Sequence, residues 1–210
     1  MRQSIGLVAG VLCLCVHSGS EARPYAGVSG LAAAADSAAT AGTNPAGATR
    51  FDTFAAKIEL ITVRSDSKWR GQVGDAGTEV GYEDSTDIFV PSGYLIKPIN
   101  DDFAFSFTLL GFGYSDDFGD WPGQYFIESY DSTSVSAYPS IAYRINEQWS
   151  IAGSLALNYS SFNQERAIAN VFDPDYDDGR STLETDGFDV GFGLSALYEL
   201  SDRSRLGLVY

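Results

Sequence analysis

The sequence predicts an all-β fold: a transmembrane antiparallel β-barrel with an N-terminal plug. Three observations support this prediction. Apolar residues alternate with small or polar residues over segments of roughly ten residues, which is typical of barrel strands with one face in lipid. The connections between these segments are alternately short and long. The chain starts with a pattern typical of an export signal, and no later stretch is apolar enough for a membrane-spanning helix.

Composition narrows the class of protein before any motif is considered. The 210 residues carry a formal net charge of −15, from 28 acidic and 13 basic residues. Nucleic-acid binding is therefore excluded as a function, because phosphate contacts need clustered lysine and arginine. Aromatic residues make up 13% of the chain and glycine occurs 22 times, which favours strands over a helical bundle.

Residues 1–22 have the pattern of a secretory signal peptide. Arg2 supplies the positive charge, and Ile5–Val16 is an apolar stretch too short to span a bilayer as a helix. Cleavage after Ser18, Ser20 or Ala22 is compatible with the sequence, and Ser20-Glu21-Ala22 fits the small-x-small rule best. We expect residues 23–50 to form the plug and residues 51–210 to form the barrel.

The predicted signal contains every cysteine and histidine of the chain: Cys13, Cys15 and His17. The mature chain then has no material for a Ser-His-Asp triad, a thiolate nucleophile, or a zinc site with histidine or cysteine ligands. We therefore expect no enzymatic activity and no cofactor. Stability without disulfides is consistent with a closed, hydrogen-bonded barrel.

The clearest predicted strand is Trp149–Ser160. Its odd positions are apolar or glycine, and its even positions are small or polar. Trp149 and Tyr159 stand at the two ends of the apolar face, ten residues apart. That distance is about 33 Å along the strand, or roughly 25 Å of membrane depth when the strand is tilted. The same alternation predicts strands at 51–64, 88–97, 103–113, 128–145, 149–160, 186–200 and 205–210.

Two features qualify this strand pattern. Pro139 lacks a backbone donor, so we expect a bulge or kink in the strand at 128–145. The stretches 65–87, 114–127 and 161–186 are predicted to be long, acidic loops on one outer face, opposite the short turns. Barrels of single bacterial chains have even strand numbers, so seven strands predict that the chain is a fragment of about half a barrel.

The segment before the first predicted strand is rich in alanine and glycine. We expect a short helix over Leu31–Ala41, ended by Gly42, and then a turn at Asn44-Pro45-Ala46-Gly47. Small residues suit a compact plug within a lumen.

This segment resembles the N-terminal hatch of the FadL/TodX family of outer-membrane transport proteins. In that family an alanine-rich hatch with an Asn-Pro-Ala-Gly motif precedes strand one, and Asn44, Pro45, Ala46 and Gly47 match the motif. Residues 139–160 and 191–210 look like the paired strands that flank the family's periplasmic turns, whereas the loops match poorly.

The resemblance implies a monomeric barrel of fourteen strands, plugged by the hatch, in a Gram-negative outer membrane. It implies passive transport of hydrophobic small molecules such as long-chain fatty acids or aromatic hydrocarbons. Substrate would be captured by extracellular loops and would leave sideways into the bilayer near a kinked strand. The implied partners are the substrate and the surrounding lipid and lipopolysaccharide.

Candidate site residues fall into four groups. Asn44, Pro45, Ala46 and Gly47 are the candidates for a gate, with a purely structural plug as the alternative. Arg144 is the best-placed lumen cation for a carboxylate ligand, with pairing to a nearby acid as the alternative. Aromatic side chains in a predicted loop are candidates for ligand entry, with a place at the barrel rim as the alternative: Tyr114, Phe118, Trp121, Tyr125 and Phe126.

The fourth group is acidic. Asp173, Asp175, Asp177 and Glu184 have the spacing of an EF-hand loop, but Asp178 stands where that loop needs glycine. A looser Ca²⁺ or Mg²⁺ contact that bridges to lipopolysaccharide phosphates is one interpretation, and a solvated loop is the other. At the level of the whole chain, two alternatives to a transporter stay open: a non-transporting scaffold or adhesin barrel, and a secreted β-sandwich that binds a ligand.

Overall fold

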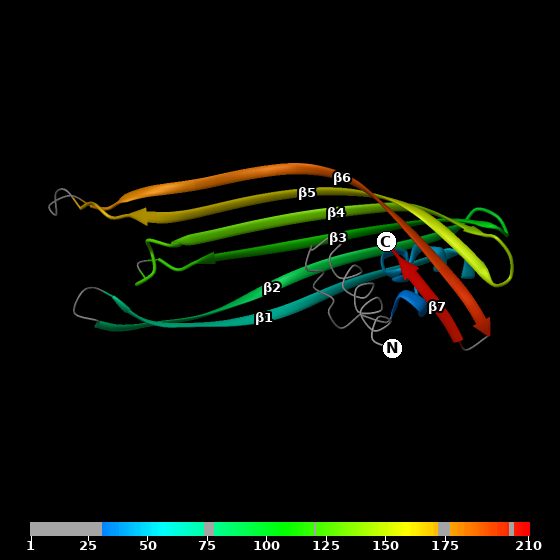
Figure 1. The fold of residues 1–210 in the computed structure, drawn as a ribbon, viewed down its shortest axis with the longest axis horizontal. Coiled ribbons are helices and arrows are strands. Elements are labelled where there is room, and N and C mark those ends of the chain that lie inside the picture. The colour runs from blue at the N-terminus through cyan, green and yellow to red at the C-terminus, as the bar shows by residue number, and fades with distance from the viewer. Residues whose placement is uncertain (1–30, 74–77, 120, 172–176, 202–203) are drawn as a thin grey trace, which may run out of the picture.

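A computed structural model describes residues 31–73, 78–119, 121–171, 177–201 and 204–210. The predicted signal peptide, residues 1–22, lies outside the described residues. The described part forms one antiparallel sheet of seven strands, and each strand pairs with the next along the chain (Figure 1). The strands are β1 (Ala55–Val73), β2 (Thr78–Pro98), β3 (Phe103–Asp117), β4 (Ser129–Arg144), β5 (Trp149–Ile168), β6 (Gly179–Ser201) and β7 (Ser204–Val209).

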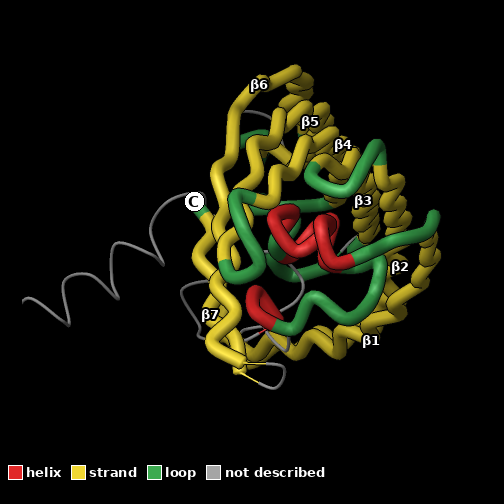
Figure 2. Tube along the Cα trace, turned by 90° about the vertical axis from the view of Figure 1, so that its right-hand side faces the viewer, coloured by secondary structure: helices red, strands yellow, loops and turns green. Residues whose placement is uncertain are grey.

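The sheet curls around the N-terminal segment. Viewed from the end, the strands form an arc with the short helices on its concave side (Figure 2). The predicted all-β fold with an internal plug is confirmed in this curled half-barrel. The β-sandwich alternative is wrong, because the described strands form one continuous sheet rather than two packed layers.

The two faces of the sheet follow the predicted alternation. In β5, Ile151 and Leu155 point away from the concave side and are 44% and 53% exposed, whereas Ser150 and Ala152 are buried. The buried core lies on the concave face, between the hatch and the strands. Alanines of the hatch dominate it, since small side chains let two backbones approach closely: Ala35, Ala38, Ala41, Ala46 and Ala48.

The strands are longer than the sequence indicated. The predicted loops at 65–87 and 161–186 are mostly strand, because β1 runs to Val73, β2 begins at Thr78, and β5 and β6 pair as far as Ile168 and Gly179. The predicted loop at 114–127 is strand only as far as Asp117. Apolar alternation ends where lipid ends, since a strand in water can carry polar residues on both faces. The hydrogen-bonded ladder continues beyond that level, so the pattern marks the membrane band and not the strand.

The hatch also differs from its prediction. The expected helix over Leu31–Ala41 is replaced by a 3₁₀ helix at η2 (Leu31–Ala33) and a short α2 (Thr40–Thr43). Ala35 has a φ of 44°, a left-handed conformation that interrupts a helix. It is buried against the rest of the hatch, so packing overrides alanine's helix propensity. Asn44 caps a further 3₁₀ helix, η3 (Pro45–Arg50), instead of starting a simple turn, and β1 begins later than expected.

The described residues contain no helix with the length and apolar character needed to cross a bilayer.

Candidate functional site

Asn44 is the central residue of the hatch. It is completely buried, and its side-chain nitrogen donates to the carbonyl oxygens of Ala32 at 2.6 Å and Ala196 at 3.0 Å. Its side-chain oxygen accepts from the backbone nitrogen of Ala46 at 3.1 Å, which caps η3. The amide therefore joins η2, η3 and strand β6. Pro45 supplies the fixed φ that suits the first position of this helix.

The rest of η3 is bonded to the sheet by buried hydroxyls. The backbone nitrogen of Ala46 donates also to the Ser195 hydroxyl at 3.1 Å. Thr49 Oγ1 lies 2.8 Å from Ser150 Oγ and donates to the Ala46 carbonyl at 3.1 Å. These contacts attach η3 to β5 and β6 without leaving its buried polar atoms unpaired.

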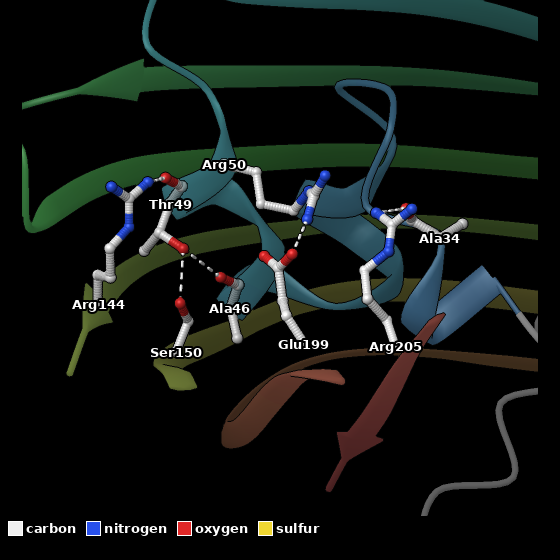
Figure 3. Close-up of polar contacts among 8 residues, drawn as sticks. All are labelled: Ala34, Ala46, Thr49, Arg50, Arg144, Ser150, Glu199 and Arg205. Atoms are coloured by element: carbon white, nitrogen blue, oxygen red, sulfur yellow. Dashed lines mark hydrogen bonds and ion pairs between the residues drawn. The ribbon is translucent and has the colours of Figure 1, made fainter. Parts of the chain in front are cut away.

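Three arginines hold the edges of the hatch (Figure 3). Arg144 of β4 donates to the Thr49 carbonyl oxygen. Arg50 forms an ion pair with Glu199 of β6 at 2.5 Å, and Arg205 of β7 donates to the Ala34 carbonyl oxygen at 2.6 Å. The hatch is therefore fixed to β4, β5, β6 and β7 by charge-assisted hydrogen bonds and hydroxyl contacts.

Two glycines allow this close approach. A Cβ atom on Gly47 would lie 2.6 Å from both Ala35 Cβ and Thr40 Oγ1, within the hatch itself. A Cβ atom on Gly207 would lie 2.2 Å from the Ala32 carbonyl oxygen, so β7 can meet η2 only without a side chain there. Gly47 was predicted as part of a turn, and its function in the structure is tight packing.

Arg144 lies on the concave face, as its alternation predicted. Its guanidinium donates to the Thr49 carbonyl oxygen. Among the described residues it forms no ion pair, so the acid pairing considered as an alternative is not observed. Beside it is a cavity of about 180 Å³, which is also lined by Asp52, Asp101 and Asp102. These three carboxylates make the cavity unfavourable for an anionic ligand.

The lumen wall beyond the hatch has two chemically different sides. Beyond the hatch, the concave face of β2 and β3 carries the apolar residues Val90, Leu110 and Phe112, with the buried Ser92 opposite Leu110. On β4 and β5 the same face carries hydroxyls and amides, and Ser140 Oγ donates to Ser154 Oγ at 2.8 Å. This polar side comprises Ser132, Ser134, Ser136, Ser140, Ser154, Asn158 and Ser160.

Strands β2 and β3 separate at the end of the sheet far from the hatch. Their pairing ends at Phe89 and Gly113, although β2 stays paired with β1 as far as Thr78 (Figure 1). Pro91 contributes to the irregularity, because it has no backbone donor and its ring packs against Gly111. At Pro139 the ladder from β4 to β5 is interrupted between Ala137 and Ser140, but the register is kept on both sides, so the structure shows a gap in the pairing and no bulge.

Aromatic rings occupy the region of this separation. Trp121 packs against Trp69 of β1 at a ring-centroid distance of 5.5 Å and against Tyr82 of β2 at 5.3 Å. Phe118 contacts both Tyr82 and Trp121, at 5.7 Å and 5.5 Å. Strands β1 and β2 and the connection between β3 and β4 thus contribute to one aromatic cluster. Because Trp69 and Tyr82 were in a predicted loop, sequence reasoning gave no reason to select them.

A buried carboxylate lies beside these rings. Asp116 is 9% exposed, and its Oδ2 accepts from the Tyr114 hydroxyl at 2.8 Å and from Thr86 Oγ1 at 3.0 Å. Burial and the hydrogen bond to Asp116 raise the pKa of Tyr114 to about 12. The Thr86 contact bridges β2 and β3 where their backbones are no longer paired. Asp116 falls in the stretch 114–127, which the sequence predicted to be an acidic outer loop, and its burial contradicts that prediction.

The structure brings together only part of the predicted entry group. Tyr114, Phe118 and Trp121 lie in the region of β2–β3 separation. Tyr125 instead donates to Asp178 at 2.7 Å, near the β5–β6 hairpin, and Phe126 is 80% exposed.

The acidic group remains a prediction. Asp173 and Asp175 lie outside the described residues. Asp177 and Glu184 are described, but no group of three or more candidate metal ligands is found among the described residues.

Comparison with known proteins gives one family and several structures. The family described as "Outer membrane protein transport protein (OMPP1/FadL/TodX)" matches residues 11–210. No curated protein matches the chain. Among solved structures, a FadL homologue from Pseudomonas aeruginosa superposes with a TM-score of 0.68 at 20% identity, over 81% of this chain and 46% of that chain.

Two TodX structures have the same fold. A TodX deltaS2S3 mutant, described as a monoaromatic hydrocarbon channel, has a TM-score of 0.62 at 16% identity. The P. putida toluene transporter TodX has a TM-score of 0.56 at 16% identity. Both matches cover 80% of this chain and 49% of the TodX chain. The chain thus spans about half the length of the solved structures that it matches.

Proposed function

Since this chain belongs to the OMPP1/FadL/TodX family of outer-membrane transport proteins, we propose that it carries hydrophobic small molecules inward by passive diffusion through a plugged barrel. The family resides in the outer membrane of Gram-negative bacteria and transports hydrophobic compounds, and it is not an enzyme family. Long-chain fatty acids and aromatic hydrocarbons are the substrate classes proposed for this chain.

The observation that supports the proposal best is the buried hatch. A barrel that serves only as a scaffold or adhesin does not need a fully buried asparagine joining three segments inside its lumen. Asn44 has all its amide hydrogens and its oxygen bonded, so the hatch has a defined resting position. A plug with a defined position closes a path, and a path is what a transporter requires.

The apolar side of the lumen supplies that path. Val90, Leu110 and Phe112 follow one another along β2 and β3, beyond the hatch. An apolar ligand gains roughly 0.8 kcal/mol for each methylene group that it buries. Such a wall therefore holds a hydrophobic molecule without a specific polar partner. Release sideways into lipid would use the part of β4 around Pro139, where the ladder to β5 is interrupted inside the membrane band.

Capture is proposed for the aromatic residues at the far end. The proposal is supported by the position of Tyr114, Phe118 and Trp121, which lie together in the region of β2–β3 separation with Trp69 and Tyr82. Arg144 is retained as the candidate cation for a carboxylate head group, although such a ligand would have to compete with the Thr49 carbonyl. The surrounding partners are proposed to be membrane lipid and lipopolysaccharide, the latter through cations at the acidic hairpins, and the barrel is proposed to be monomeric.

The test is a double substitution of the hatch motif, Asn44→Ala with Pro45→Ala. The expected result is a changed rate of permeation by hydrophobic and small polar solutes, with the barrel still inserted and folded. Permeation is measured in proteoliposomes that contain protein purified from outer membranes. Insertion is checked by the circular dichroism of the strands and by the shift of the band on unheated gels.

A matched control changes Asn158 to Ala, since this asparagine faces the lumen away from the hatch and its side chain accepts a hydrogen bond from the Tyr138 hydroxyl. Equal permeation by the wild type, the double variant and the control would contradict gating by the hatch. Absence of any uptake by the wild type would favour the scaffold or adhesin alternative.

A further inference from the structure

The aromatic-carboxylate site, defined here as Trp69, Tyr82, Phe118, Trp121 and Asp116 with the hydroxyls of Tyr114 and Thr86, has no role in holding the hatch. The site lies at the opposite end of the sheet. Gly111, Val135 and Tyr159 are at one level of the sheet, and Tyr159 marks the aromatic border of the membrane band. Tyr114 follows Gly111 by three residues, so the site lies just beyond the band on the side of the long hairpins.

The rings of the site form an incomplete enclosure rather than a closed core. None of the four rings is fully buried, and their contacts are edge-on or tilted, with centroids 5.3 to 5.7 Å apart. Edge-on packing leaves ring faces and edges available to a further aromatic ring. A second chain of rings extends from Tyr114 through Tyr130 to Phe162, with centroid distances of 5.3 and 5.1 Å.

The carboxylate of Asp116 adds a hydrogen-bond acceptor to this aromatic surface. Both of its hydrogen bonds, from Tyr114 and Thr86, go to Oδ2. Within the described residues, its second oxygen, Oδ1, accepts no hydrogen bond. Oδ1 is not among the fully buried side-chain atoms that lack a partner, so water still reaches it. A ligand that brings a donor can replace that water, whereas a ligand without one leaves the oxygen desolvated and unpaired.

The electrostatic surroundings exclude one kind of ligand. Asp84 lies within 3.4 Å of the Thr86 hydroxyl and so close to Asp116. Trp69 stands between two exposed cations of β1, Lys68 and Arg70. Lys68 is paired with Glu83, and Arg64, further along the strand, with Asp66 and Asp87. All three cations are at even positions, on the face opposite Trp69. A ligand carboxylate at this site would therefore meet like charges without a β1 cation on the same face to offset them.

We infer that this site selects small aromatic molecules that carry a hydrogen-bond donor, a hydroxyl or an amine, and rejects aromatic carboxylates. The ring of the ligand packs among Trp69, Tyr82 and Trp121, and its donor bonds Asp116 Oδ1. The inference rests on the proposed function, because it assigns the substrate class at the capture step of that transport route.

The experiment is a binding series on purified protein, by isothermal titration calorimetry with phenol, benzylamine, toluene and benzoate. The four probes have the same ring and differ in the head group. We expect phenol and benzylamine to bind about tenfold more tightly than toluene, the effect of one buried hydrogen bond, and benzoate to bind most weakly. Benzylamine alone being preferred would restrict the class to cations, and phenol alone would restrict it to neutral donors; either supports selection through Asp116.

Two variants and one control separate the parts of the site. Asp116→Asn keeps the shape and removes the charge, so the donors should lose most of their advantage over toluene while benzoate gains. Asp117→Asn removes the same charge from the adjacent exposed position, on the other face of β3, and should leave the order unchanged. Trp121→Leu should weaken all four probes to a similar extent.

The results distinguish this inference from the proposed function. Uptake of toluene into proteoliposomes tests transport alone and does not need Asp116. If the wild type takes up toluene but binds benzoate as well as phenol, the inference is overturned and the transport proposal stands. An order of affinities that Asp116→Asn and Asp117→Asn alter equally overturns it as well. If Asp116→Asn does not insert, the wild-type order and the Trp121→Leu series decide the question.

Discussion

The two ends of the lumen are built from different contacts. At the hatch end, small side chains bring backbones together, and polar atoms such as those of Asn44 and Thr49 have fixed partners. At the far end, large rings fill the space between strands that are no longer paired, and Asp116 keeps one oxygen without a described donor. The first arrangement specifies one position of the plug, whereas the second leaves ring faces and one carboxylate oxygen available. In the proposals above, resting closure and capture use separate sets of residues, which substitutions can test separately.

The largest effect is expected from Asn44→Asp. The substitution keeps the shape but removes two donated hydrogen bonds and places a negative charge opposite the Ala32 and Ala196 carbonyl oxygens. Burial of an unpaired charge should destabilise the docked hatch by about 3–5 kcal/mol. Hydrogen exchange of the hatch amides measures this loss, since the hatch can open while the barrel stays folded. Asn158→Asp is the control, because this partly exposed side chain accepts from Tyr138 and a carboxylate still does so. Equal protection of the hatch in both variants would refute this role of Asn44.

Close packing at the hatch end gives the next largest effect. Gly47→Ala would place a methyl group 2.6 Å from Ala35 Cβ and Thr40 Oγ1, so the hatch must shift. We expect a destabilisation of about 1–3 kcal/mol, which is typical of overpacking. Gly153→Ala is the matched control, because nothing lies within 4 Å of a Cβ atom added there on the outward face. The melting temperature is measured by thermal unfolding in detergent. It should be lower than that of the wild type for Gly47→Ala and unchanged for Gly153→Ala. A similar melting temperature for both variants would show that the hatch is loosely packed.

These differences also explain how much of the molecule the sequence predicted. The alternation in Trp149–Ser160 gave the outward and inward faces of β5 correctly, because one face of that segment is in lipid and the other is not. The same criterion placed the strand limits too early, since it responds to lipid and not to hydrogen bonding. Trp69 and Tyr82 were therefore assigned to a loop.

The candidate site was predictable only in part, for a related reason. The Asn-Pro-Ala-Gly motif located the hatch, and alternation placed Arg144 on the concave face. The partners of these residues were not predictable: Ala196 is 152 residues from Asn44, and Thr49 is 95 residues from Arg144. Asp116 fell within a predicted acidic loop, because its contact with the Thr86 side chain of β2 cannot be read from the local sequence. Local pattern thus identifies elements, while contacts between distant elements determine the function of a residue.

A smaller effect is expected at the edge of the hatch. Glu199→Gln removes the charge from the ion pair with Arg50, and both side chains are more than a quarter exposed. Water and salt screen such a pair, so the loss should be about 0.5–1 kcal/mol in the free energy of unfolding. Denaturant unfolding at low and high salt measures it. The difference between wild type and variant should shrink at high salt, and a difference independent of salt would indicate that the contact acts through packing instead.

The smallest effect at neutral pH concerns Tyr114, because it appears only in alkali. The raised pKa of about 12, against the usual 10.0, means that folding favours the protonated phenol. Its hydrogen bond to Asp116 is therefore fully present below pH 10.0 and lost as the pH rises through about 12. Ultraviolet titration of tyrosinate in the wild type and in Tyr114→Phe should differ by one group that ionises near pH 12. In Asp116→Asn that group should ionise earlier, because the nearby negative charge is gone. If the group that Tyr114→Phe lacks titrates near pH 10.0 in the wild type, Tyr114 is freely hydrated. The far end of the lumen would then lack the buried carboxylate that distinguishes it from the hatch end.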